Sequence, residues 1–144
     1  MFQSRKAISP ILATLLLIVI AVAAIVVTYA WVMTYISSTT SQAGIMLSED
    51  NTSWPSAGKI VITVRNTGTS DATLDKIYIG ANENNLTPIN STDVTYDPTS
   101  QIVSKNGGTI TITVTYSWNS TTTYYFKIAP LTGSPLGPYQ EKSP

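Results

Sequence analysis

The side chains that enzymes most often use for catalysis are missing from this chain. It contains neither His nor Cys, which removes the commonest general base, the thiol nucleophile and zinc sites built from these residues. Ser and Thr are plentiful, but no His is present to activate their hydroxyls. We therefore expect no catalytic residue and no cofactor, and we predict that the protein is not an enzyme.

The carboxylates form no recognisable metal site. Asp71 and Asp75 lie four positions apart in the C-terminal part, and Glu49 is adjacent to Asp50. A calcium site needs several oxygen ligands on a defined loop, and the EF-hand spacing is absent. We expect these carboxylates to be solvated in turns, and we predict that no metal is bound.

Four sequons offer sites for covalent modification instead. The pattern Asn-x-Ser/Thr accepts N-linked sugar, and a bulky sugar is tolerated at surface turns. The four acceptor residues fall at predicted turns and are Asn51, Asn85, Asn90 and Asn119. If the protein is exported, we expect sugar on at least one of them.

The charged residues are unevenly distributed along the chain. The formal net charge is zero, so no basic footprint predicts binding to nucleic acid. No residue between Lys6 and Glu49 is charged, and residues 11–36 are almost entirely apolar. At about 1.5 Å per residue, a helix over this run is roughly 39 Å long, which exceeds the ~30 Å hydrocarbon core of a bilayer. Because the run has no polar face, we predict a helix over residues 7–36 that is surrounded by lipid or by other apolar helices.

Two features of this run bear on its surroundings. Ala13, Ala21 and Ala24 are small and would let neighbouring helices approach closely. Trp31 and Tyr35 stand at the far end, where aromatic residues of membrane helices meet the interface. Both features suit a helix that lies in a membrane or packs tightly against copies of itself.

A secretory signal peptide is the alternative reading of the N-terminus. Ala21, Val22 and Ala23 match the small-residue cleavage pattern of such peptides. Cleavage after Ala23 would leave residues 24–36, which are also apolar, on the mature N-terminus. The usual apolar region of a signal peptide is only about 7–15 residues long, which disfavours this alternative.

The order of residues at the N-terminus resembles that of archaeal type IV pilins. The basic pair Arg5 and Lys6 precedes Ala7, and Ser9 and Pro10 then lead into the long apolar run. The likeness covers about the first 36 residues. In that family a prepilin peptidase removes residues like 1–6 as a leader, so the resemblance implies cleavage between Lys6 and Ala7.

The resemblance also implies what the helix does. After leader removal, the helices of many pilins leave the membrane and pack into the core of a filament, while the C-terminal domains form its sheath. Bacterial pilins usually carry Glu at the fifth mature position, whereas archaeal relatives commonly lack it, as this chain does. The residues that we assign to helix packing in the filament core are Ile11, Leu15, Ile18, Val22, Ala23, Ile25 and Tyr29.

Beyond the helix, the hydrophobic pattern changes to a period of two. We predict a polar hinge over residues 37–44 and a β domain over residues 45–144. Alternating apolar residues predict strands over 59–65, 73–79, 101–104, 109–118 and 121–129, with further candidates at 45–47, 86–89 and 94–96.

Two turns complete the predicted β domain. We expect the strand at 73–79 to pair with that at 59–65 across a turn at residues 66–68. We expect a hairpin turn at Asn119 and Ser120 to join the strands at 109–118 and 121–129.

This number of short strands predicts an immunoglobulin-like sandwich, so the fold class is α+β: a long hydrophobic helix followed by an all-β domain. The tail contains four prolines, at positions 130, 135, 138 and 144. Because Pro cannot donate to a strand ladder, we expect the tail to form an edge or a packing arm.

These patterns predict a structural subunit of an archaeal type IV pilus, a cell-surface filament for adhesion. Its expected partners are copies of itself, the prepilin peptidase and the pilus assembly machinery. Its precursor would wait in the cytoplasmic membrane, and no nucleic acid is involved. Two alternatives stay open: an archaellin, which builds a motility filament on the same plan, and a monomeric membrane-anchored surface protein.

The leader generates the first testable prediction. Because a basic pair directly precedes Ala7 and an uninterrupted apolar helix, we expect the mature chain to begin at Ala7. N-terminal sequencing of the protein purified from cells measures this. A chain that starts at Met1 would contradict removal of the leader, and one that starts at Ala24 would lack the first part of the apolar run and so contradict the core-helix interpretation.

Overall fold

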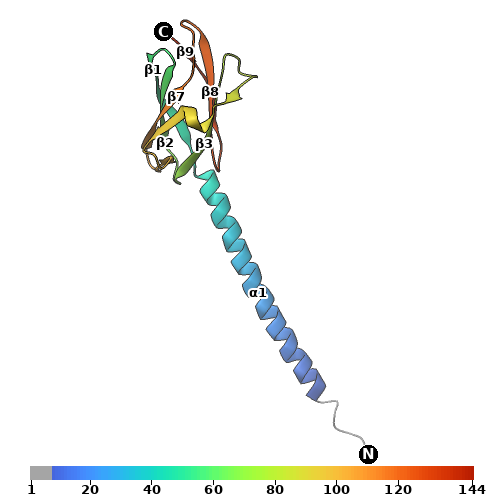
Figure 1. Ribbon diagram of the computed structural model, residues 1–144. Helices are drawn as coiled ribbons and strands as arrows, with labels where there is room; N and C mark the ends of the chain where they lie inside the picture. The colour runs from blue at the N-terminus through green and yellow to red at the C-terminus, as the bar shows by residue number, and fades with distance from the viewer. Residues whose placement is uncertain (1–7) are drawn as a thin grey trace, which may run out of the picture. The chain divides into compact units, whose positions relative to one another are not determined.

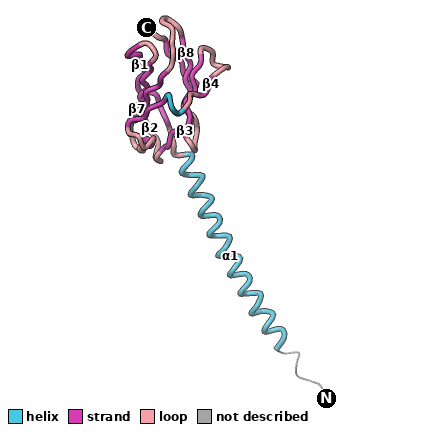
Figure 2. Tube along the Cα trace, viewed as in Figure 1, coloured by secondary structure: helices cyan, strands magenta, loops and turns pink. Residues whose placement is uncertain are grey.

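The computed structural model describes residues 8–144. The chain divides into two compact units, one that reaches Thr39 and one that spans Thr40–Pro144. Helix α1 (Ile8–Ala43) accounts for the first unit, and its last residues belong to the second. The second unit consists of strands and their connections (Figures 1 and 2).

Helix α1 continues through the segment where we predicted a hinge. Residues 37–43 are helical, so the predicted hinge over 37–44 and the predicted helix end at residue 36 were both wrong. The hydroxyls of Ser38 and Thr39 donate to the Tyr35 carbonyl, at 3.0 and 2.9 Å. Hydroxyls bonded in this way stay within the helix and do not draw the backbone into a turn.

The β unit contains two antiparallel sheets. The strand order is β1-β2-β7-β5 in the first sheet, which consists of β1 (Leu47–Ser56), β2 (Lys59–Asn66), β7 (Gly108–Thr115) and β5 (Val94–Asp97). The strand order in the second sheet is β4-β3-β8-β9. Its strands are β4 (Thr87–Pro88), β3 (Ala72–Gly80), β8 (Thr123–Pro130) and β9 (Leu136–Lys142). The short β6 (Ile102–Val103) pairs with β3, and a 3-10 turn, η1 (Ser91–Asp93), precedes β5.

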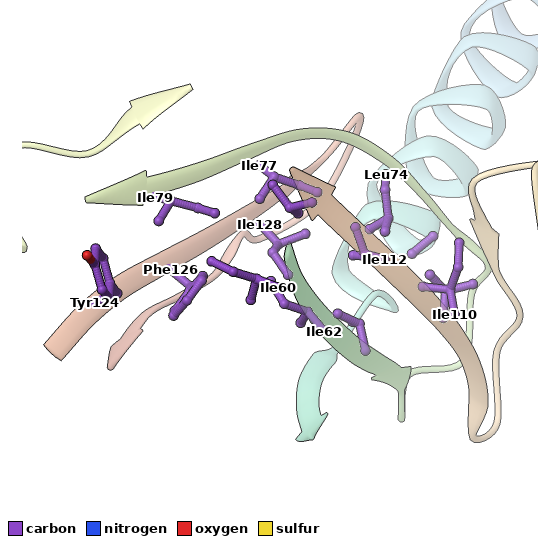
Figure 3. Close-up of a cluster of buried hydrophobic side chains, with 14 of the residues drawn as sticks. Ile60, Ile62, Leu74, Ile77, Ile79, Ile110, Ile112, Tyr124, Phe126 and Ile128 are labelled. Atoms are coloured by element: carbon purple, nitrogen blue, oxygen red, sulfur yellow. The ribbon is translucent and has the colours of Figure 1, made fainter. Parts of the chain in front are cut away.

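The core lies between the two sheets. Alternate residues of β2, β7, β3 and β8 are fully buried, and their side chains point toward one another in Figure 3. Ile62 of β2 lies opposite Ile112 of β7, while Ile77 of β3 lies opposite Ile128 of β8. The predicted immunoglobulin-like sandwich is therefore confirmed, and its strands form because each presents one apolar face.

Both predicted hairpins were wrong. Strand β2 pairs with β1 and β7, whereas β3 pairs with β8 in the other sheet. The chain crosses between the sheets at residues 67–71, and the buried side chain of Asn66 holds this crossing. Its amide donates to the carbonyls of Ser70 and Val103, at 2.8 and 3.0 Å, and its oxygen accepts from the Gly68 N–H at 2.9 Å.

The connection from β7 to β8 is a second crossing between the sheets. The Asn119 N–H donates to the Tyr124 hydroxyl at 2.9 Å, and the Ser143 hydroxyl donates to the Asn119 carbonyl at 2.6 Å. Ser143 is buried, although it lies beside the chain end. These bonds replace the two-residue turn that we expected at Asn119 and Ser120. The tail itself forms β9, an edge strand of the second sheet, as predicted.

The first crossing also fixes the start of the β unit. The Gly44 carbonyl accepts from the N–H groups of Thr69 and Ser70, at 2.7 and 3.2 Å. Gly68 lies so close that a Cβ on it would collide with the Gly44 carbonyl oxygen. Only Gly permits this approach, so the turn signal in the sequence marks a backbone contact and not a hairpin.

The core generates the second prediction. Ile112→Ala should lower the free energy of unfolding of the β unit by about 2–5 kcal/mol, because it opens a cavity between the sheets. The matched control Ile102→Ala removes the same atoms from a side chain that is 42% exposed, and should cost about 1 kcal/mol or less. Guanidinium denaturation of the full chain in detergent, followed by near-UV circular dichroism, measures both. Equal losses would contradict the assigned core.

Candidate assembly helix and surface sites

The surface of α1 is apolar on all sides. Six of the residues assigned to the filament core are 54–68% exposed, and Ala23 is also exposed. The segment Pro10–Thr40 is long and apolar enough to cross a membrane, and none of it is buried within the chain. A surface of this size and kind requires lipid or protein around it.

Six of the seven predicted core residues lie along one stripe of the helix. Their spacing alternates between four and three residues, which keeps them on one face. They are Ile11, Leu15, Ile18, Val22, Ile25 and Tyr29. Ala23 lies on a different face. The opposite side is equally apolar, since Leu17, Ile20 and Val27 are 70%, 59% and 69% exposed.

The threonine hydroxyls within the apolar run are all satisfied inside the helix. Those of Thr14, Thr28 and Thr34 donate to the carbonyls of Ile11, Ala24 and Ala30, at 2.9, 2.8 and 2.9 Å. No Thr in this run therefore needs an outside acceptor, and the helix can be placed in a fully apolar surrounding. At the far end, the rings of Trp31 and Tyr35 stack with centroids 5.8 Å apart.

The predicted cleavage site, Lys6 and Ala7, lies outside the described residues. The expected removal of residues 1–6 therefore remains a prediction from the sequence.

The four sequon residues are all exposed on the β unit, but they differ in their backbone surroundings. Asn85 lies between β3 and β4, Asn90 directly precedes η1, and Asn119 lies in the β7–β8 connection. Asn51 lies inside β1, where it pairs with Thr63 next to a register shift. The expectation that it occupies a turn was wrong, because a bulge at an edge strand gives the same local sequence pattern.

The carboxylates singled out in the sequence serve structure. Asp71 accepts a hydrogen bond from the Lys105 N–H at 2.9 Å and so anchors the loop after β6. Asp50 accepts two bonds from the Arg65 guanidinium, at 3.2 and 3.0 Å, which hold the pKa of its carboxyl below the usual range. Among residues 8–144, no group of three or more acidic, His or Cys side chains could hold a metal.

A hollow of about 420 Å³ lies where the chain passes from β4 to β5. Asp75, Asn90, Tyr96 and Gln101 are among its lining residues. Burial raises the pKa of the Tyr96 hydroxyl, and the Asp75 charge adds to this effect. No sequence pattern predicts this hollow, because its lining residues come from β3, β4, β5 and connecting segments. It contains no activated nucleophile.

The sequence also contains one spacing that is typical of a catalytic site. Ser56 and Lys59 have the Ser-x-x-Lys spacing of penicillin-binding enzymes. In the structure they flank the tight turn between β1 and β2, and both side chains are exposed. Both side chains face water on a turn, and neither lines the hollow described above, so the spacing alone does not make a site that could hold a substrate.

Comparison with solved structures identifies proteins of similar fold. The chain is similar to the archaellum periplasmic stator protein FlaG from Sulfolobus acidocaldarius, with a TM-score of 0.57 and 20% identity, over 67% of this chain and 99% of that one. It is also similar to a chain in the stator complex of FlaF and FlaG from the same organism, with a TM-score of 0.55 and 20% identity, over 66% of this chain and 87% of that one. No protein-family model and no curated protein matches the chain.

At this identity the likeness concerns the fold. The chain shares an immunoglobulin-like architecture with this archaeal stator protein.

The sequons generate the third prediction. Sugar added to the folded β unit should favour Asn90 and Asn119, which lie in connections, over Asn51 and Asn85. Asn51 is held in a strand ladder, and the hydroxyl of Thr87, which completes the Asn85 sequon, donates to the Ile79 carbonyl at 3.0 Å. Mass spectrometry of glycopeptides from the native protein measures occupancy at each site. Higher occupancy at Asn51 than at Asn119 would contradict the ranking.

Proposed function

We propose that this chain is a structural subunit of an archaeal type IV pilus and that it assembles through α1. The observation that supports this most directly is the long apolar helix, whose membrane-length segment is not buried within the chain. In the precursor the helix would lie in the cytoplasmic membrane. In the filament it would pack against the helices of neighbouring copies, with the β units as an outer sheath for adhesion on the cell surface.

The distribution of apolar side chains favours a bundle of several helices and not a pair of helices. A pair would cover the stripe that contains Val22 but leave Leu17, Ile20 and Val27 in water. Several neighbours, related by a contact that does not close on itself, would cover every face and produce an open helical filament. The small side chains of Ala13, Ala21 and Ala24 would let such helices approach closely.

Processing and transport complete the proposed pathway. A prepilin peptidase would cut between Lys6 and Ala7, and the pilus assembly machinery would then extract the helix from lipid. The resemblance of residues 5–13 to pilin N-termini supports this step.

A second candidate is a protein of the archaellum apparatus whose helix stays in the membrane. The likeness to FlaG, which covers 99% of that chain, favours it. In this case the β unit would stand outside the membrane and bind other envelope proteins, as the complex of FlaF and FlaG suggests. An archaellin, which polymerises through its helix, is the third reading.

The fourth prediction separates assembly from anchoring. Ala23→Glu places a charge in the middle of α1. Burial of that charge in an apolar bundle without a partner costs on the order of several kcal/mol. We expect the wild-type chain to form long filaments in negative-stain micrographs and the variant to form none, while near-UV circular dichroism shows a folded β unit. Ser38→Glu, which adds the same charge beyond the apolar run, is the matched control and should assemble.

Two outcomes would contradict the proposal. Monomeric wild-type protein in detergent, with no filaments from cells or after detergent removal, would favour the membrane-anchored alternative. Normal filaments from Ala23→Glu would show that this face of α1 is not packed in the filament.

A further inference from the structure

Strands β8 and β9 present unbalanced positive charge on the outer face of the second sheet. Alternate residues of β8 are buried in the core, which leaves Tyr125 and Lys127 on the outer face. Lys142 of β9 pairs with Thr123 and lies on this face too. No carboxylate shares the face on these two strands. We name Tyr125, Lys127 and Lys142 the basic face.

The charges of the basic face have no acidic partner within the described chain. Among residues 8–144, the ion pair that the structure contains joins Arg65 to Asp50, on the other sheet. Lys127 instead places its ammonium 5.9 Å from the centroid of the Tyr78 ring. A cation–π contact of this length orients the side chain but leaves its charge available to a partner.

Negative charge gathers on another part of the β unit. Residues 77–104 contain no Lys or Arg but include Glu83, Asp93 and Asp97. Asp93 and Asp97 lie in the stretch that leads from β4, an edge strand of the second sheet, to the end of β5, an edge strand of the first, and Glu83 lies in the loop before β4. The nearest cation in sequence, Lys76, lies on β3 and lines the hollow beside this stretch. We name Glu83, Asp93 and Asp97 the acidic edge.

The two surfaces cannot neutralise each other within one chain. Strands β4 and β9 stand at opposite ends of the order β4-β3-β8-β9, so the second sheet separates the acidic edge from β9. Sheet extension between copies is also disfavoured, since β4 is only two residues long and includes Pro88, while β9 contains Pro138. A contact between copies at these surfaces must therefore use side chains.

From this arrangement we infer that the basic face of one copy docks on the acidic edge of the next. The occupant is a second copy of this chain, because the same β unit carries both complementary surfaces. Such a contact is head-to-tail and joins different surfaces, which is the type that generates open filaments. The inference rests on the proposed function and adds a contact in the sheath to the packing of helices.

The strength expected of this contact is modest. Exposed ion pairs contribute little each and are screened by salt. Complementary charge instead accelerates association and selects the register in which copies meet. The contact should therefore set the rate and order of assembly, while the apolar helix supplies most of the stability.

Paired charge reversals test the inference on the full chain. Lys127→Glu with Lys142→Glu makes both surfaces acidic, and Asp93→Lys with Asp97→Lys makes both basic. At low salt, we expect each variant alone to yield at least about fivefold less pelletable filament than the wild type. An equal mixture of the two should restore the yield, because each then offers the surface that the other lacks. That rescue would also show that both variants fold.

The matched control is Lys59→Glu with Lys105→Glu, which makes the same change in net charge away from the basic face and should assemble normally. Three results would overturn the inference and leave the proposed function standing. They are normal filament yields from both test variants, an equal loss of yield in the control, and no recovery of yield when the two variants are mixed. A Lys127→Glu, Lys142→Glu variant that assembles normally but no longer binds heparin would also overturn the inference. That result would assign the basic face to binding an anionic polymer. A wild type that forms no filaments would overturn the proposed function together with the inference.

Discussion

An apolar helix that its own chain leaves uncovered is the constraint on which the other features depend. Residues 10–40 expose aliphatic side chains on every face, and the Thr hydroxyls among them donate to carbonyls of the same helix. Water is a poor solvent for such a surface. Lipid or other apolar helices must therefore surround it.

The β unit forms its core in a chain that has no cysteine and therefore no disulfide. Its sheets contribute Ile, Val, Leu and Phe side chains that are almost fully buried between them. Two crossings between the sheets are each held by one buried polar residue, Asn66 or Ser143. Because both residues bond to backbone groups of distant segments, they fix which strands become neighbours. The polar residues thus specify the topology, while the apolar residues supply the burial.

This division explains which parts of the fold could be predicted from the sequence. The alternation at 59–65, 73–79, 109–118 and 121–129 predicted the existence of four core strands, because each buries one face. Their pairing was not predictable in the same way, since a turn signal such as residues 66–68 has the same appearance in a hairpin and in a crossing. The helix end was missed because Ser38 and Thr39 can bond to the Tyr35 carbonyl as well as to a turn.

The candidate assembly residues were accessible to sequence analysis because a helix face follows from spacing alone. The charge separation was not, because it depends on which strands lie at the sheet edges.

The positions of the tryptophans give the protein a built-in optical reporter. Trp54 and Trp118 contact each other edge to face in the β unit, with ring centroids 5.1 Å apart, and Trp54 also meets the rings of Tyr124 and Phe126. Trp31 is separate, on the exposed surface of α1, where it stacks on Tyr35. Its indole emission therefore depends on what surrounds the helix, whether lipid headgroups, detergent or the side chains of another copy. With Trp54 and Trp118 replaced by Phe, the fluorescence of one residue would follow the helix from membrane to assembled state without an attached dye.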